Sequence, residues 1–111
     1  MFQITDAFGN TIRLTRWTYE SHLAVHPEIA DYLAEAEQTL QEPSNVEAGR
    51  DGAVHFFKAG LGRGKFQHCH VHVIVRYDVA SDAAIKAGET AGVVATYWLD
   101  RSASVTNGRK L

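Results

Sequence analysis

The chain has 111 residues, of which 45% are hydrophobic and 22% are charged, a composition typical of one ordinary globular domain. It contains no run of 18 apolar residues and no basic, apolar leader, so we expect neither a membrane span nor a signal peptide and predict a cytoplasmic protein. The net charge of −2 argues against a strongly basic nucleic-acid binder, and the single cysteine, Cys69, excludes an internal disulfide.

The first element that we expect is a hairpin over residues 2–14. FQIT and NTIRLT alternate apolar and polar residues as strands do, and DAFG between them has the composition of a turn. A helix capped by Thr15 should follow over residues 16–26. His26-Pro27 should end it, because proline disfavours helical geometry in the residue that precedes it.

A second helix is predicted from Pro27 to the residues before Pro43. Its apolar residues recur at steps of three and four, at Ile29, Leu33, Ala36 and Leu40. Three strands rich in β-branched and aromatic residues then follow, over residues 53–58, 66–78 and 91–100, after a short strand near Val46. Residues 79–90 are expected to form a loose loop or one helical turn.

This order of elements predicts an α+β domain over residues 1–101. The N-terminal hairpin and two helices should pack on one face of a roughly four-stranded antiparallel sheet, because consecutive strands pair readily and helices cover an apolar face. Residues 102–111, which read SASVTNGRKL, are predicted to be a flexible C-terminal tail.

The segment FQHCHVHVIVRY, residues 66–77, separates two sets of residues. Successive side chains of a strand point to opposite faces. One set is Cys69, Val71, Val73, Val75 and Tyr77; the other is His68, His70, His72, Ile74 and Arg76. The first set is expected to meet the helices, and the second to face outward from the uncovered side of the sheet.

Three interpretations of the outward histidines stay open. A metal site requires a third ligand, which His55 on the preceding strand would supply, although no carboxylate lies close in sequence. His22 and His26 have the i, i+4 spacing of a zinc helix, but HLAVH lacks the glutamate of a metalloprotease. A solvated face carrying polar residues for solubility is the second interpretation, and an acid/base site is the third.

The acid/base interpretation assigns these groups to RNA cleavage. Attack by the 2′-hydroxyl of RNA needs a base, an acid and cations that stabilise charge on the phosphate. Imidazole serves as acid or base near neutral pH, and no cofactor is required. The groups that would act are His70, His72, Arg76, Thr96, Tyr97, Arg101 and, on the AGLGRGK loop, Lys65.

The distribution of charge is compatible with an anionic ligand. Residues 1–49 contain Arg13 and Arg16 against eight acids, a net charge of −6, whereas residues 50–111 contain nine Lys or Arg against five acids, a net charge of +4. The positive half includes the histidine strand. This asymmetry equally permits attraction between the two halves.

Several short motifs occur in an order that resembles a known family. They are Trp17 in a short helix, His22 followed by His26-Pro27-Glu28, the connection LQEPSNV and the last strand VVATYWLDR. Over roughly residues 10–101 they resemble the phage-associated branch of the barnase/EndoU/colicin/RelE-like nuclease superfamily. The resemblance implies helices packed against a four-stranded antiparallel sheet and metal-independent endoribonuclease activity in prophage or toxin settings. The histidine strand takes the place of a valine-rich segment of that family.

The resemblance also implies site residues and partners. The helix histidines of the family correspond to His22 and His26, and its last-strand pair corresponds to Thr96 and Tyr97. RNA is the implied substrate, and a toxin setting implies an inhibitor or antitoxin protein.

The leading hypothesis is therefore an RNase-like domain that cleaves RNA by 2′-hydroxyl attack to a cyclic phosphate. We expect His22 and His72 to act as acid and base, and Thr96 or Tyr97 to orient the phosphate. Arg76 and Arg101 would hold its charge, with further substrate contacts from His26, His70 and Lys65. The alternatives are a catalytically silent module of the same fold that binds a protein or forms a homodimer, and a histidine-based metal-binding protein.

Overall fold

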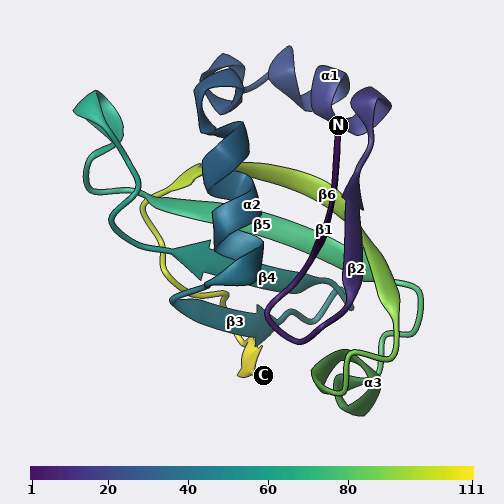
Figure 1. Ribbon diagram of the computed structural model, residues 1–111. Coiled ribbons are helices and arrows are strands. Elements are labelled where there is room, and N and C mark those ends of the chain that lie inside the picture. Colours follow the sequence, from purple (N-terminus) through teal and green to yellow (C-terminus); the bar gives the residue numbers. More distant parts are fainter.

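A seven-stranded mixed sheet forms the centre of the computed structural model, which describes residues 1–111 (Figure 1). In their order across the sheet the strands are β1 (Phe2–Thr5), β2 (Thr11–Leu14), β6 (Ala91–Asp100), β5 (His70–Tyr77), β4 (Val54–Lys58), β3 (Asn45–Ala48) and β7 (Arg109–Lys110). The helices are α1 (Arg16–Leu23), α2 (Leu33–Gln41) and α3 (Asp82–Lys86), with short 3-10 helices η1 (Pro27–Tyr32) and η2 (Gly64–Phe66). None of these helices has the length and apolar character needed to cross a membrane.

The two predicted helices form, with one change at the second. Thr15 caps α1 as expected, because its hydroxyl oxygen accepts a hydrogen bond from the Thr18 N–H at 3.2 Å. The segment predicted as a single helix from Pro27 is divided into η1 and α2. Proline suits the start of η1 because its missing N–H leaves no helical bond unmade there. Regular α-helical geometry begins at Leu33.

Helix α2 covers one face of the sheet, where it lies against β1, β4 and β5 (Figure 1). Ala36 and Leu40 of α2 belong to one apolar core with Val71, Val73 and Val75 of β5, and all five are fully buried. The predicted orientation of the valine face toward the helices is therefore confirmed. The opposite face of β4, β5 and β6 is called the outer face below.

The α+β class is confirmed, but the expected four-stranded antiparallel sheet is wrong in number and in direction. The N-terminal hairpin is part of the sheet, because β2 pairs in parallel with β6 through residues 11–13 and 91–93. At the other side, β3 and β7 extend the sheet beyond β4. Parallel pairing joins segments that are far apart in sequence, so no local pattern announces it.

The C-terminal residues differ from the flexible tail that was predicted. Residues 101–108, called the return segment here, cross to β3 on the side opposite α2 (Figure 1). The Ala103 carbonyl accepts a hydrogen bond from Asn45 Nδ2 at 2.9 Å, and the Val105 N–H donates to Glu47 Oε1 at 2.9 Å. Arg109 then pairs with Asp82 of α3 at 2.8 Å. These partners supply bonds that a polar sequence does not reveal by itself.

A bulge in β6 decides which of its residues face outward. Ile74 pairs with Thr96 and Val75 pairs with Val94, so Ala95 is an additional residue on β6. Such an insertion shifts the alternation of side chains by one position. Val94 and Tyr97 are both buried on the helix side as a result.

Candidate functional site

Two rows of side chains cross the outer face at the level of the histidine strand. The strand register places Phe57 of β4, His72 of β5 and Trp98 of β6 side by side. The neighbouring row contains His55, Ile74 and Thr96. Phe57 is fully buried although no helix covers this face. The return segment lies on this side of the sheet, where it bonds to Asn45, the residue that pairs with Phe57.

His72 lies at the centre of the outer face and is buried, with 5% of its surface exposed. Its Nδ1 lies 2.9 Å from Asp100 Oδ2, and its Nε2 lies 2.8 Å from His55 Nδ1. The ring stacks on Phe57 at 4.1 Å between centroids and lies 4.5 Å from the Trp98 ring. His72 therefore lies on the predicted face of the strand, but aromatic rings enclose it and both nitrogens have protein partners, so it is not an exposed acid or base.

The hydrogen bonds of His72 belong to a longer sequence of groups, which we call the histidine chain: Asp100, His72, His55 and Asp51. His55 Nε2 lies 3.9 Å from Asp51 Oδ1. Burial lowers the pKa of both imidazoles, and the partner carboxylates, Asp100 for His72 and Asp51 for His55, oppose the shift. Both rings are consequently neutral at neutral pH, and each hydrogen bond fixes a tautomer.

A glycine leaves room for the outer end of the histidine chain. A Cβ atom at Gly49 would lie 2.9 Å from His55 Nε2 and 2.8 Å from Asp51 Oδ1. These distances are too short for ordinary contact, so any larger residue at position 49 would displace one of the two side chains. Arg76 lies beside the same end, at 3.8 Å from Asp51.

His22 and Thr96, two of the site residues that the family resemblance implies, are in contact. Helix α1 begins just after β2 ends and lies against β6. His22 Nδ1 is 3.1 Å from Thr96 Oγ1, and both residues are half-buried. The second ring nitrogen of His22, Nε2, has no hydrogen-bond partner in the protein. An imidazole held at one nitrogen and free at the other is arranged to exchange a proton with a ligand.

His26 lies near this pair through Trp98, two residues after Thr96 on β6. The His26 and Trp98 rings are nearly parallel, at 18°, with centroids 6.3 Å apart. His26 Nδ1 is 3.5 Å from Glu28 Oε1, so a negative charge adjoins it. We call His22, His26, Thr96 and Trp98 the His22 cluster.

Tyr97 is not part of this cluster. It lies on the helix side of β6, is 1% exposed and donates a hydrogen bond through its hydroxyl to the Ile29 carbonyl at 2.9 Å. Adjacent residues of a strand point to opposite faces, so only one of Thr96 and Tyr97 can reach the outer face. Of the two residues expected to orient a phosphate, Thr96 alone therefore lies on the outer face.

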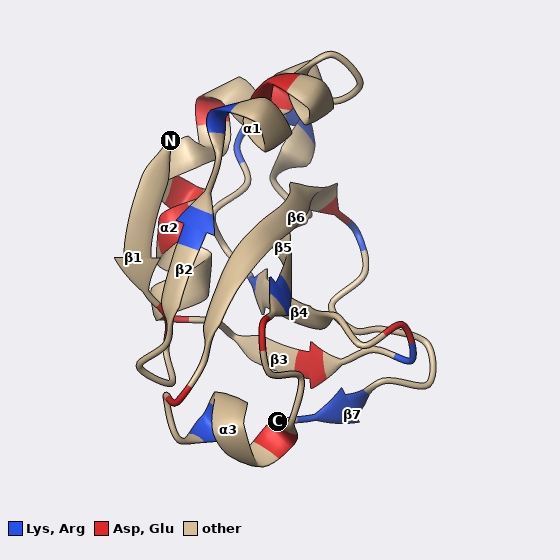
Figure 2. Ribbon diagram, turned by 90° about the vertical axis from the view of Figure 1, so that its right-hand side faces the viewer, with Lys and Arg blue, Asp and Glu red and all other residues tan.

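The predicted cations are spread over the molecule. Arg76 is exposed near the far end of β5, paired with Asp51, whereas Arg101 follows the end of β6 and has no ion-pair partner. In Figure 2 basic and acidic segments alternate around the sheet, so the charge asymmetry of the sequence does not gather into one basic tract. Only Arg101 follows directly on the strand that carries Thr96 and Trp98.

The two remaining predicted contacts have different surroundings. His70 pairs in register with Asp100, and its Nδ1 is buried without a hydrogen-bond partner. Lys65 lines a separate hollow of about 430 Å³, and its Nζ lies 5.2 Å from the centroid of the Phe66 ring. The other residues lining that hollow are Glu28, Asp31, Tyr32, Arg63, Gly64 and Phe66. Glu28 thus adjoins both this hollow and His26.

The metal interpretation receives no support from the arrangement of side chains. No group of three or more His, Cys, Asp or Glu residues is placed to hold a metal ion. His55 and His72, proposed as two of three ligands, form a hydrogen bond with each other instead. The buried Nδ1 of His70 has no hydrogen-bond partner. Imidazoles that hydrogen-bond to each other do not share a cation.

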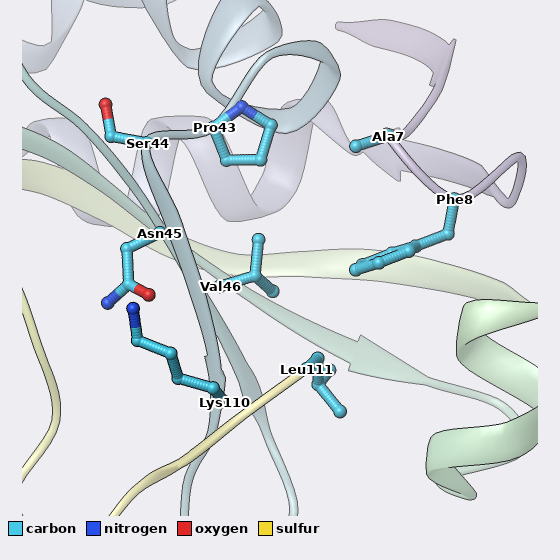
Figure 3. Close-up of a pocket in the computed structure, with 8 residues that line it drawn as sticks. All are labelled: Ala7, Phe8, Pro43, Ser44, Asn45, Val46, Lys110 and Leu111. Carbon is cyan, nitrogen blue, oxygen red and sulfur yellow. The ribbon is translucent and has the colours of Figure 1, made fainter.

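A second hollow, of about 270 Å³, lies away from the His22 cluster. Figure 3 shows Phe8, Val46 and Leu111 gathered around it, with Ser44, Asn45 and Lys110 among the polar groups at its side. None of the predicted site residues lines it.

Sequence reasoning missed the main partners of the buried histidine. Asp100 was not singled out, and His55 was considered only as a metal ligand. The available signal was weak: Asp100 alternates with Thr96 and Trp98 on the last strand. Its pairing with His72 depends on the register between β5 and β6, which side-chain alternation does not determine.

Similarity to known proteins adds no information about this site. Comparisons of the chain with protein-family models, with curated protein sequences and with solved structures gave no match. The candidate site is therefore defined by its geometry: a half-buried imidazole with one free nitrogen, a hydroxyl partner, a second imidazole on an indole ring, and an exposed guanidinium at Arg101.

Proposed function

We propose that the protein is a metal-independent, endoribonuclease-like protein that cleaves RNA by 2′-hydroxyl attack, with the His22 cluster as its site. The observation that carries this proposal is the 3.1 Å contact between His22 and Thr96. These two residues are 74 positions apart in the chain. The motifs that resemble the nuclease superfamily imply both positions as site residues, and the fold brings them together.

His22 is the proposed proton-transfer group. Whichever of Thr96 Oγ1 and His22 Nδ1 donates in their hydrogen bond, the bond orients the ring and leaves Nε2 for the substrate. His26, 3.5 Å from Glu28, is the proposed second imidazole. A pair of imidazoles supplies one group to take the 2′-hydroxyl proton and one to protonate the leaving 5′-oxygen.

Trp98 and Arg101 are the proposed substrate contacts. An indole ring offers a surface on which a base stacks, and stacking tolerates any base. Arg101, three residues beyond Trp98 at the start of the return segment, would hold the charge that develops on the phosphate. The His72 ring contacts the Trp98 ring and helps to hold it in position. His72 has no role in proton transfer to RNA.

The proposal is tested with purified protein and a short single-stranded RNA, in EDTA, between pH 6 and 8. The expected product carries a 2′,3′-cyclic phosphate. His22→Ala should reduce the rate by about 100-fold or more, the usual contribution of a positioned acid or base. Thr96→Ala should reduce the rate and Thr96→Ser should retain most of it, because serine keeps the hydroxyl.

The control is His68→Ala, which alters an exposed histidine outside the cluster. Intact RNA at enzyme amounts comparable to substrate would contradict the proposal. So would a His22→Ala protein that folds normally and cleaves at the rate of the parent.

A protein-binding module without catalysis is the second candidate. It is favoured by two apolar side chains near α1, Trp17 at 78% exposure and Val25 at 71%. Large apolar groups so exposed are more typical of a contact surface than of a free one. A homodimer or a complex with an inhibitor protein that is lost in Trp17→Ala, together with unaltered RNA in the assay above, would favour this candidate.

A further inference from the structure

The outer face carries a buried arrangement that RNA cleavage does not use. The histidine chain runs across the sheet from Asp51 through His55 and His72 to Asp100. Buried imidazoles joined directly to each other are sensitive to added protons, because their shared hydrogen bond needs one donor and one acceptor.

The number of protons that the histidine chain accepts follows from its contacts. Asp100 accepts from His72 Nδ1, so His72 Nε2 must accept from His55 Nδ1. A first added proton is tolerated on His55 Nε2, because that atom faces Asp51 and both existing bonds survive. A second proton on His72 Nε2 would place an N–H on each side of a 2.8 Å contact. The two rings would then have to separate.

The return segment is held by the carboxylates that face the two imidazoles. Asp100 accepts from His72 through Oδ2 and from the Ser102 N–H through Oδ1, at 2.9 Å in each case. Glu47 pairs in register with His55 and accepts from the Val105 N–H at 2.9 Å. Displacement of the rings therefore acts on two of the bonds that hold the return segment, while a third joins Asn45 to the Ala103 carbonyl.

The charged groups around the pair come from four parts of the fold. They are Glu47 on β3, Asp51 in the turn before β4, Arg76 and the titratable His70 on β5, and Asp100 on β6. Lys110 of β7 lies near Glu47. The three carboxylates thus favour the binding of the first proton to the imidazole pair, and the positive charge of Arg76 opposes it.

We propose that the His55–His72 pair is an acid-sensitive latch for the return segment. Double protonation separates the rings, releases residues 101–108 from the outer face and uncovers Phe57. The latch is a property of the fold and does not depend on the proposed RNA cleavage.

The titration of the neighbouring groups sets the pH range in which the latch opens. Burial lowers the pKa of both imidazoles below the ordinary histidine value of 6.5. The Val105 hydrogen bond lowers the pKa of Glu47, so its carboxylate stays ionised while the histidines titrate. Opening is therefore expected on acidification below the ordinary histidine pKa of 6.5.

Hydrogen exchange of backbone amides at pH 7.5 and pH 5 tests the latch, after correction for the intrinsic effect of pH. The amides of Ser102 and Val105 should exchange about tenfold faster at pH 5, while those of Val71 and Val73 in the core keep their protection. Equal protection of the return segment at both pH values would overturn the proposal. Simultaneous loss of protection in β5 would also overturn it, because the event would then be global unfolding.

His55→Gln is the decisive variant. A glutamine amide rotates to donate to neutral His72 or to accept from protonated His72, so a proton on His72 no longer breaks the contact. The acid-dependent exchange of the return segment should disappear in His55→Gln and persist in the control His68→Gln. Should His55→Gln fail to fold, nitrogen chemical shifts of the parent's imidazoles provide a second test. Separate titration of His55 and His72 with the 2.8 Å bond intact throughout would exclude the latch.

Discussion

Thr96 and Tyr97 are neighbours in sequence with different surroundings and different roles. Thr96 reaches the outer face and contacts His22, whereas the Tyr97 ring is enclosed in the core and its hydroxyl bonds the Ile29 carbonyl. This bond ties β6 to η1 and thereby fixes the segment that precedes α2. The two residues should respond in opposite ways to removal of a hydroxyl group.

Tyr97→Phe should lower stability and leave RNA cleavage unchanged. The substitution removes the hydroxyl and its hydrogen bond to the Ile29 carbonyl, at a cost of about 1 kcal/mol. Urea denaturation and the cleavage assay measure the two effects. Tyr19→Phe is the matched control, since the Tyr19 hydroxyl makes no hydrogen bond. A large loss of cleavage without a loss of stability would assign Tyr97 to the site after all.

At the scale of elements, the position of the site depends on α1 and β6. Thr15 starts α1 immediately after β2, and the helix carries His22 to Thr96. The bulge at Ala95 turns Thr96 and Trp98 outward. Side-chain alternation from Val94 without this bulge would direct Tyr97 outward instead, which is why the sequence alone left both Thr96 and Tyr97 as candidates.

Thr15→Ala should weaken α1 and, with it, the placement of His22. The loss of the cap costs about 1 kcal/mol in helix stability. We expect a lower rate of RNA cleavage with little change in substrate affinity, because α1 carries the acid/base group and Trp98 lies on β6. Thr15→Ser retains the capping oxygen and serves as the control. Equal rates for Thr15→Ala and the parent would show that α1 is held by its packing alone.

At the scale of the whole molecule, the histidine chain makes stability depend on pH. Folding lowers the pKa of His55 and His72, so below pH 6.5 the unfolded chain binds more protons than the folded one. Stability therefore rises with pH through this range, is fully present above about pH 7 and falls as the solution is acidified.

Urea midpoints between pH 7.5 and pH 5 measure this dependence. We expect the midpoint to decrease steadily over that range in the parent and to decrease less in His55→Gln. Hydrogen bonds lower the pKa of three carboxyl groups, Glu47, Asp51 and Asp82, whose ordinary pKa values are already acidic. Their titration therefore changes stability only below about pH 4.5. A midpoint that rises on acidification would contradict the assignment of two buried neutral imidazoles.

The sequence by itself determined the elements that depend on local chemistry. Alternation in FQIT, NTIRLT and HVHVIVRY gave the strands and the valine face, Thr15 gave the start of α1, and Pro27 and Pro43 bounded the next helical segment. Each of these features follows from side-chain direction or backbone restriction within a few residues. The resemblance of short motifs named His22 and Thr96 as site residues, and their contact depends on the fold.

The tertiary structure alone decided the parallel pairing of β2 with β6, the bulge at Ala95, the return of residues 101–108 to the sheet, and the burial of His72. Each depends on which distant segments share hydrogen bonds, and the free energy of such pairing comes from packing of the whole chain. An alternating strand has the same pattern whether its polar face meets water or another imidazole. The sequence therefore identified the histidine strand, and only the fold revealed that His72 is enclosed by its partners while His22 keeps a free nitrogen.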